Sequence, residues 1–122
     1  MALCLERIRY LLIDMDGVLY RGTTGLPGGP ELLAFLRERG IRFLLVTNNS
    51  TLTPAEFVRR FAGMGIEVDE EEIMTSGVAT AAYLETLAPK GTKVNVVGEP
   101  ALLEEISKRG YVIAGRDSRY VI

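Results

Sequence analysis

The stretch Tyr10-Leu11-Leu12-Ile13-Asp14-Met15-Asp16-Gly17 decides how the rest of the chain is interpreted. A short apolar run ends in two aspartates one residue apart, and a glycine follows at once. Continuous apolar runs of this length, bounded by a breaker, are typical of strands buried in parallel sheets. Open α/β sheets bind their ligands beyond the carboxyl ends of the strands. Asp14 and Asp16 are therefore candidates for a functional site.

The composition is that of an ordinary globular chain with a mild acidic balance. The 122 residues are 48% hydrophobic and 25% charged, with a formal net charge of -2. A chain of this length can bury roughly two-thirds of its unfolded surface, which is enough for a core. We expect no nucleic-acid partner, because such proteins usually carry a basic patch. We expect no membrane partner either, because no apolar run reaches the roughly 20 residues that span a bilayer. Homo-oligomer formation is left open.

The cysteine and histidine content excludes several kinds of catalytic centre. The chain has one cysteine, Cys4, and no histidine. A single cysteine forms no internal disulfide, and residues 1–10 lack the apolar region of a signal peptide, so we expect a cytoplasmic protein. Without histidine there is no Ser-His-Asp triad, no usual zinc site and no base to activate Cys4 as a nucleophile.

Apolar runs alternate with amphipathic segments along the chain, which predicts an α/β fold with a parallel sheet in a Rossmann-like, three-layer arrangement. The predicted strands are residues 8–13, 41–46, 73–74, 93–97, 111–114 and a final run at 119–122. The predicted helices are residues 31–39, a segment after the capping box at 53–56, a segment from Thr75 or Ser76 to about Ala88, and residues 100–109. Residues 18–20 are expected to form a short extended arm, and residues 69–72 a solvated charged turn.

A second polar cluster, Thr47-Asn48-Asn49, follows the second predicted strand. The carboxyl ends of parallel strands lie at one edge of a sheet, so we expect this cluster near the two aspartates. Thr47 and the backbone N–H groups after it can hold phosphoryl oxygens, and Gly17 allows the backbone to approach a ligand closely. The structural alternative is a pair of turn-capping aspartates and an Asx-rich loop. Both clusters fall at strand ends, which favours a site.

Phosphate-ester chemistry suits these carboxylates when a divalent cation is present. A carboxylate and a phosphate dianion repel by about 1 to 4 kcal/mol per pair of charges at 4 Å. A hard, oxygen-preferring cation such as Mg²⁺ reverses that repulsion. Asp14 can then attack phosphorus as a nucleophile, while Asp16 protonates the leaving alcohol and later deprotonates water.

Two segments resemble known motifs. Residues 13–19 resemble the first motif of the haloacid dehalogenase superfamily, and residues 46–50 resemble the second. Residues 19–22, 47–49, 75–80 and 96–99 are similar to the NagD and 4-nitrophenylphosphatase-like branch of that superfamily. The resemblance covers nearly all of the chain, and its combination of motifs is far more specific than two spaced aspartates.

The resemblance implies a Mg²⁺-dependent phosphatase that hydrolyses a small phosphorylated metabolite through an aspartyl-phosphate. It implies that Asp14 is the nucleophile, that Asp16 is the general acid and base, and that Mg²⁺ is held by the Asp14 carboxylate and the Asp16 backbone carbonyl. Thr47 and Asn48 match phosphate-binding positions, and Asn49 and Gly17 are predicted to help. Residues 1–90 would be the N-terminal part of the catalytic core, and residues 91–122 the beginning of an inserted α/β cap domain.

The chain departs from the family pattern after Thr47, where nothing matches the third motif, a lysine, or the fourth, an acidic pair that completes the metal site. We therefore expect the N-terminal half of a longer phosphatase, which alone binds Mg²⁺ weakly and has little or no activity. One alternative is a non-catalytic fragment that acts as a dimer or interaction module. A less favoured alternative is a receiver-like phosphoacceptor domain, which would need an acceptor aspartate at its third strand and a late lysine.

Overall fold

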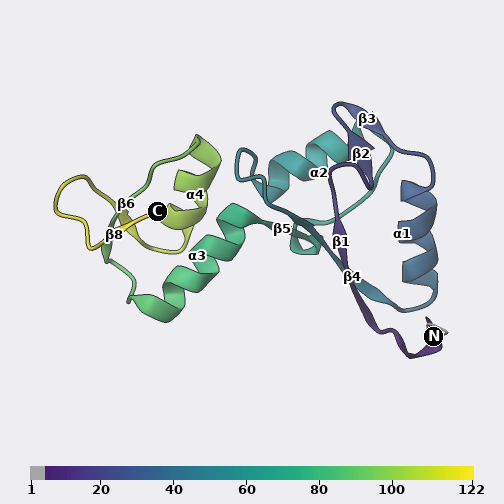
Figure 1. Ribbon diagram of the computed structural model, residues 1–122, viewed down its shortest axis with the longest axis horizontal. Coiled ribbons are helices and arrows are strands. Elements are labelled where there is room, and N and C mark those ends of the chain that lie inside the picture. The colour runs from purple at the N-terminus through teal and green to yellow at the C-terminus, as the bar shows by residue number, and fades with distance from the viewer. Residues whose placement is uncertain (1–4) are drawn as a thin grey trace. The chain divides into compact units, whose positions relative to one another are not determined.

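The computed structural model describes residues 5–122, which form two compact units (Figure 1). The first unit contains the described residues up to Thr47 together with Phe57–Ile73, and the second contains Asn48–Glu56 and Met74–Ile122. Both units combine helices with parallel strands, so the predicted α/β class is confirmed. Cys4 lies outside the described residues. Within them, no helix has the length and apolar character needed to cross a membrane.

A three-stranded sheet has the order β1-β4-β5, and its parallel pair β1–β4 is the centre of the first unit. A short 3₁₀ turn, η1 (Leu5–Arg7), precedes β1 (Tyr10–Asp14), which pairs with β4 (Arg42–Thr47) so that Tyr10 is opposite Arg42. The third strand is β5 (Ile73–Thr75). The first strand begins two residues later than predicted and ends on Asp14 itself.

Two helices contribute to the first unit, α1 (Gly29–Glu38) and the greater part of α2 (Pro54–Ala62), and Figure 1 shows both beside the sheet. Helix α1 begins two residues before the predicted start, because Gly28 takes the left-handed conformation (φ 86°) at the N-cap. The buried apolar side chains of this unit are Ile13, Met15, Leu19, Tyr20, Leu33, Leu36, Leu45, Phe57, Phe61, Ile66, Val68 and Ile73.

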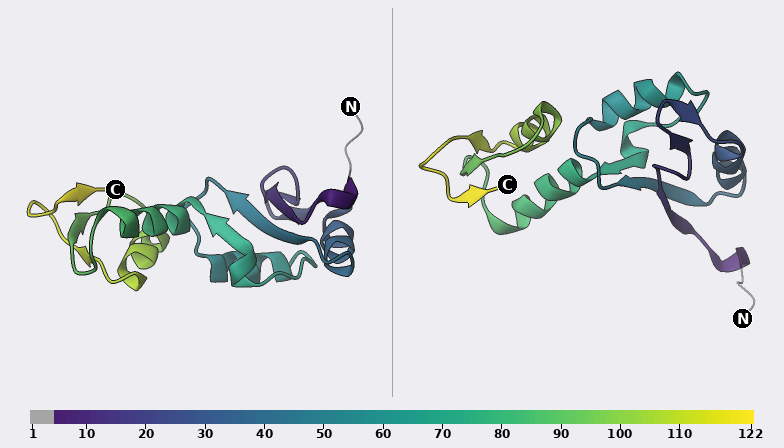
Figure 2. Two further views of the ribbon diagram at one scale, coloured as in Figure 1. Left: turned by 90° about the horizontal axis from the view of Figure 1, so that it is seen from below. Right: turned by 45° about the horizontal axis from the view of Figure 1, so that its top comes forward.

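The prediction of a short extended arm at residues 18–20 is wrong. The backbone carbonyl of Met15 accepts N–H groups from Val18, Leu19 and Tyr20, which closes a turn. The chain then forms an antiparallel hairpin of β2 (Tyr20–Arg21) and β3 (Thr24–Gly25). Figure 2 shows this hairpin beyond the end of β1.

The predicted charged turn at residues 69–72 is a 3₁₀ turn, η2 (Glu70–Glu72), preceded by Asp69. The backbone N–H of Asp69 donates to Glu72 Oε2 at 3.0 Å, which is one half of a capping box. Glu72 also pairs with Arg37 of α1 at 2.8 Å. Glu70 and Glu71 are exposed, as the prediction of a solvated turn requires.

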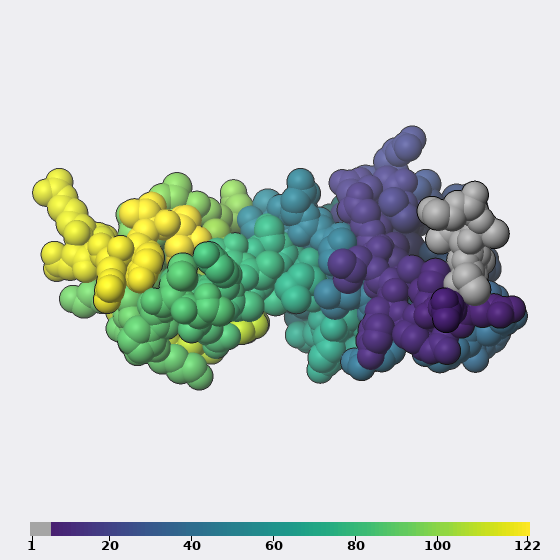
Figure 3. Space-filling model, turned by 60° about the horizontal axis from the view of Figure 1, so that its bottom comes forward, coloured from purple at the N-terminus to yellow at the C-terminus, as the bar shows by residue number. Residues whose placement is uncertain are grey.

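The second unit contains α3 (Ser76–Leu87), α4 (Pro100–Lys108) and a parallel sheet in the order β7-β6-β8. The strands are β6 (Lys93–Asn95), β7 (Val112–Ile113) and β8 (Tyr120–Val121). All three predicted strands exist but are shorter than expected. The core cluster consists of Ala81, Leu84, Ala88, Val94, Leu102, Ile106 and Tyr111. In Figure 3 the yellow C-terminal residues lie at the surface of this unit.

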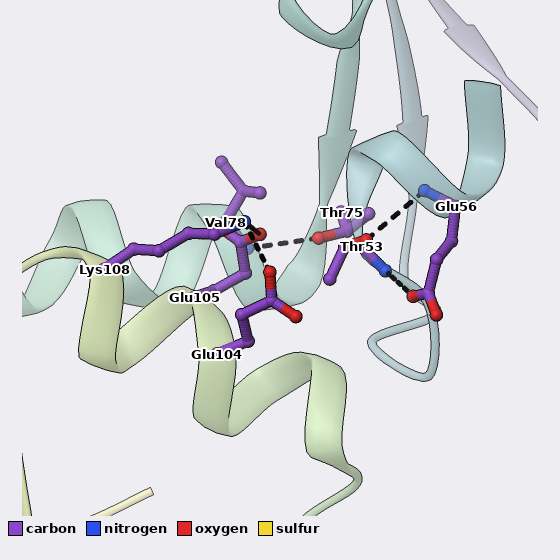
Figure 4. Close-up of polar contacts among 7 residues, drawn as sticks. All are labelled: Thr53, Glu56, Thr75, Val78, Glu104, Glu105 and Lys108. Atoms are coloured by element: carbon purple, nitrogen blue, oxygen red, sulfur yellow. Dashed lines mark hydrogen bonds and ion pairs between the residues drawn. The ribbon is translucent and has the colours of Figure 1, made fainter. Parts of the chain in front are cut away.

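Both predicted helix caps in the second unit are present (Figure 4). Thr75 Oγ1 accepts the backbone N–H of Val78 at 3.1 Å and begins α3. Thr53 and Glu56 form the reciprocal capping box of α2: the Thr53 N–H donates to Glu56 Oε2 at 2.7 Å, and the Glu56 N–H donates to Thr53 Oγ1 at 3.3 Å. These caps are local in sequence, which is why the sequence alone predicts them.

The buried ring of Phe57 should be a major source of stability in the first unit. Phe57 is 0% exposed, and its ring packs against that of Phe61 with 6.0 Å between the two ring centroids. We expect Phe57→Ala to lower the free energy of unfolding by about 3–5 kcal/mol, because the substitution removes a large buried side chain and leaves a cavity. The matched control is Phe35→Ala, because Phe35 is 47% exposed and its loss should matter much less. Equal losses in urea unfolding would contradict this account of the core.

Candidate active site

The pairing of β1 with β4 brings Asp14 and Thr47 to one edge of the sheet. Asp14 is the last residue of β1 and lies opposite Val46, and Thr47 is the last residue of β4. The Asp14 side chain is exposed, whereas Thr47 is buried. This edge is the carboxyl end of both strands, where α/β sheets bind ligands.

Asp14 and Asp16 are both exposed, on either side of the fully buried Met15. Successive side chains of an extended segment point in opposite directions, so burial of Met15 turns both carboxylates outward. The backbone N–H of Met15 donates to Asp14 Oδ1 at 2.9 Å and fixes that carboxylate at the strand end. Two carboxylates in water carry no burial penalty, and both remain available to a ligand.

Gly17 has a backbone that favours glycine and leaves open space above it. Its φ is 79°, in the left-handed region, and its N–H donates to the Tyr20 carbonyl at 2.8 Å. A Cβ added at this position would meet nothing within 4 Å. The glycine is therefore required by the turn itself, and the turn presents an unobstructed backbone surface.

Three side chains support this turn from the hairpin and from α2. Tyr20 is 2% exposed, and its ring contacts Phe61 edge-on at 5.5 Å between centroids. The guanidinium group of Arg60 lies 5.1 Å from the centre of the Tyr20 ring and donates to the backbone carbonyl of Gly22. Sequence reasoning placed Phe61 on the inner face of its helix but missed its contact with Tyr20 and missed Arg60 altogether, because these partners lie about 40 residues earlier and no local pattern links them.

The carboxylates also act on Tyr20 electrostatically. Burial is the main cause that raises the pKa of the Tyr20 hydroxyl above its ordinary value of 10.0, and the nearby Asp16 charge raises it further. Arg60 opposes this shift, and Asp14 adds a smaller increase. Both negative charges of the turn therefore bear on the tyrosine that anchors it.

Asn48 and Asn49 belong to the second unit. The Asn48 carbonyl accepts the Ser76 hydroxyl at 2.8 Å. Asn49 Oδ1 accepts the Thr51 N–H at 2.8 Å and the Thr51 hydroxyl at 2.7 Å, which is an Asx-type turn of the kind that the structural alternative describes. Their roles in phosphate binding stay predictions.

The donor set at the end of β1 fits a hard cation but does not complete its shell. Asp14 and Asp16 supply exposed oxygen atoms, which Mg²⁺ prefers. Among residues 5–122 there is no group of three or more histidine, cysteine or acidic side chains that could hold a metal ion. The two aspartates can therefore be part of a magnesium site, together with ligands from elsewhere.

Known proteins that resemble this chain include several phosphatases. A family model for haloacid dehalogenase-like hydrolases matches residues 11–112. The chloroplastic phosphoglycolate phosphatase 1A of Arabidopsis thaliana is 38% identical over 112 residues, which cover 91% of this chain and 31% of the relative. The acid sugar phosphatase of Staphylococcus aureus (strain USA300) is 36% identical over 109 residues, which cover 89% of this chain and 42% of the relative. The chain thus spans less than half the length of either.

Solved structures give the same result. NagD from Escherichia coli K-12 matches with a TM-score of 0.86 and 34% identity, over 93% of this chain and 45% of NagD. A 4-nitrophenylphosphatase from Thermotoga maritima matches with a TM-score of 0.86 and 32% identity, over 93% and 43%. A glycerol phosphate phosphatase from Mycobacterium tuberculosis, solved in complex with magnesium, matches with a TM-score of 0.84 and 27% identity, over 95% and 36%. The predicted resemblance to the NagD and 4-nitrophenylphosphatase-like branch is confirmed.

The left-handed backbone of Gly17 predicts a specific cost for a side chain. We expect Gly17→Ala to lower the free energy of unfolding by about 1 kcal/mol, because an L-residue is strained at this φ. Gly115→Ala is the matched control, since its Cβ also meets nothing within 4 Å and its φ is not in the left-handed region. Urea unfolding of both variants tests this, and equal effects would show that backbone strain is not the cause.

The raised pKa of Tyr20 predicts a loss of stability at alkaline pH. The unfolded chain releases this proton near pH 10.0, below the folded pKa, so the stability that Tyr20 contributes is full below that pH and falls as the pH rises through the folded pKa. Tyr20→Phe should therefore flatten the decline in the free energy of unfolding that the wild type shows as the pH rises above about 10. Tyr83→Phe, at a tyrosine that is 64% exposed, should leave the decline as in the wild type. A Tyr20→Phe profile parallel to the wild type would refute this linkage.

Proposed function

The chain belongs to the haloacid dehalogenase-like hydrolases, and we propose that Asp14, Asp16, Gly17 and Thr47 form part of a phosphatase active site. Its substrate would be a small phosphorylated metabolite, hydrolysed through an aspartyl-phosphate. The observation that carries this proposal is the register of β1 with β4, which brings a nucleophile candidate and a phosphate-binding candidate to one sheet edge. The phosphatase activity named for the relatives supports the reaction class.

The proposed reaction needs two acids with different tasks. An Asp14 carboxylate oxygen attacks phosphorus, the bond from phosphorus to the ester oxygen breaks, and Asp16 gives its proton to the leaving alcohol. Water then attacks the phosphorus of the aspartyl-phosphate, and Asp16 takes the proton that this water loses. Cleavage of the bond between phosphorus and Asp14 releases phosphate and restores both acids. The exposure of both side chains leaves room for these transfers.

Polar groups at the carboxyl ends of β1 and β4 would bind the phosphoryl group. We assign Thr47 and the backbone N–H groups of Asn48 and Asn49 to the phosphoryl oxygens, with Gly17 allowing close approach. The Asp14 carboxylate and the Asp16 backbone carbonyl would hold Mg²⁺. When bound, this ion neutralises the negative charge between carboxylate and phosphate. The magnesium complex of the Mycobacterium tuberculosis relative supports the choice of ion.

The chain alone is proposed to hold only the first part of the site. It spans 31% and 42% of the two curated relatives, and its described residues contain no third acidic ligand near the pair. We propose residues 1–90 as catalytic core and residues 91–122 as the beginning of an inserted cap domain. The alternative of a non-catalytic interaction module rests on the same two observations. The family match favours a hydrolase over the receiver-like alternative. A cytoplasmic location stays a prediction.

Removal of the nucleophile tests the proposal. We expect the 122-residue chain to bind Mg²⁺ weakly and to hydrolyse 4-nitrophenyl phosphate little or not at all, and we expect Asp14→Asn to abolish the Mg²⁺ binding. Asp117→Asn, at an exposed aspartate of the second unit, is the control for loss of one charge and should bind as the wild type. Isothermal titration with Mg²⁺ and a release assay for 4-nitrophenol provide the measurements.

Two outcomes would contradict parts of this proposal. Rapid hydrolysis by the chain that Asp14→Asn abolishes would show that no further residues are needed. Magnesium binding that Asp14→Asn leaves unchanged would show that the metal lies elsewhere.

A further inference from the structure

We propose that Arg60 is a positioning residue for the candidate site: it fastens the β2–β3 hairpin to α2 and so fixes the turn that carries Asp16 and Gly17. Among residues 5–122, no hydrogen bond or ion pair joins Arg60 to either aspartate, and it contacts Tyr20 and Gly22. The importance of the turn for binding rests on the proposed function, whereas the fastening itself does not.

The hairpin needs an anchor of this kind. Each of its strands has only two residues, and Gly22 adopts a left-handed φ of 60° between them. Two-stranded hairpins of this size are marginal at best in water, so contacts with the rest of the unit must supply the stability. Figure 1 shows α2 as the helix beside the hairpin.

Arg60 supplies two contacts from one planar group. The guanidinium lies over the Tyr20 ring, and one of its N–H groups donates to the Gly22 carbonyl. The planar fork of arginine can stack on a ring and donate a hydrogen bond at its rim at the same time. A lysine can keep the charge and one hydrogen bond but not the stacking, so it should substitute only in part.

The backbone carries this restraint from the hairpin to the turn. The Gly17 N–H donates to the Tyr20 backbone carbonyl at 2.8 Å. Leu26, which follows the hairpin, donates its N–H to the Leu19 carbonyl, also at 2.8 Å. Movement of Tyr20 therefore breaks the hydrogen bond that shapes the turn at Gly17. Asp16 forms an isolated backbone β-bridge with Tyr20 and would shift with it.

Amide exchange and Mg²⁺ titration of the ¹⁵N-labelled 122-residue chain test this inference. The variants are Arg60→Ala, Arg60→Lys and the matched control Arg59→Ala, at the exposed neighbour in the same helix. We expect Arg60→Ala to speed exchange of the Gly17 and Leu26 amides by about tenfold while the β4 amides keep their rates. We expect it also to weaken Mg²⁺ binding several-fold. Arg60→Lys should restore part of both effects, and Arg59→Ala should match the wild type.

Three results would overturn the inference: an unchanged Gly17 exchange rate, an equal acceleration in β4, or an accelerated Gly17 with unchanged Mg²⁺ affinity. The first two refute the local restraint, because they mean no anchoring or a general loss of stability. The third refutes the link to the site. If the wild type binds no Mg²⁺, or binds it equally well after Asp14→Asn, the proposed metal site fails instead. The exchange rates then decide alone whether Arg60 holds the turn.

Discussion

The register between β1 and β4 is the constraint on which the candidate site depends. With Asp14 opposite Val46, the alternation of side chains buries Ile13 and Leu45 and turns the last acid of β1 outward. A shift by one residue would move every side chain of the strand to the other face. It would place Asp14 in the core and Ile13 in water, so the burial of the apolar residues also fixes the direction of the carboxylate.

The turn after β1 also keeps an apolar side chain buried and an acidic one exposed, although it is not part of a strand. The Met15 side chain is buried, and its backbone carbonyl accepts three N–H groups. In this compact turn the Asp16 side chain is exposed to solvent. The fold thus holds two like charges within three residues at no cost of burial. The tyrosine beneath them is affected instead: its hydroxyl is buried beside both charges, which raises its pKa.

The features that the sequence predicted are those with local causes. The caps at Thr53 and Thr75 arise from residues three apart, and the end of the first strand follows from an apolar run that meets an acid. The hairpin was missed because its contacts outside its own strands include those with Arg60 and Phe61, which follow it by about 40 residues. A single sequence carries no sign of such a distant pairing. The short strands of the second unit were overestimated, because an apolar run records burial and does not set where a hydrogen-bonded ladder ends.

Strand β1 leaves both apolar side chains and a carboxylate exposed to solvent. β1 lies at the edge of the described sheet, and its outward row includes Tyr10 and Leu12, which are 69% and 73% exposed. Asp14 continues that row, and the described residues supply no third acid to share a cation with it. A segment that covered the apolar part of the row would lie beside the carboxylate at its end. The exposed apolar side chains of β1 and its terminal carboxylate therefore lie in one row, so a segment packed on Tyr10 and Leu12 would also limit the space open to a ligand of Asp14.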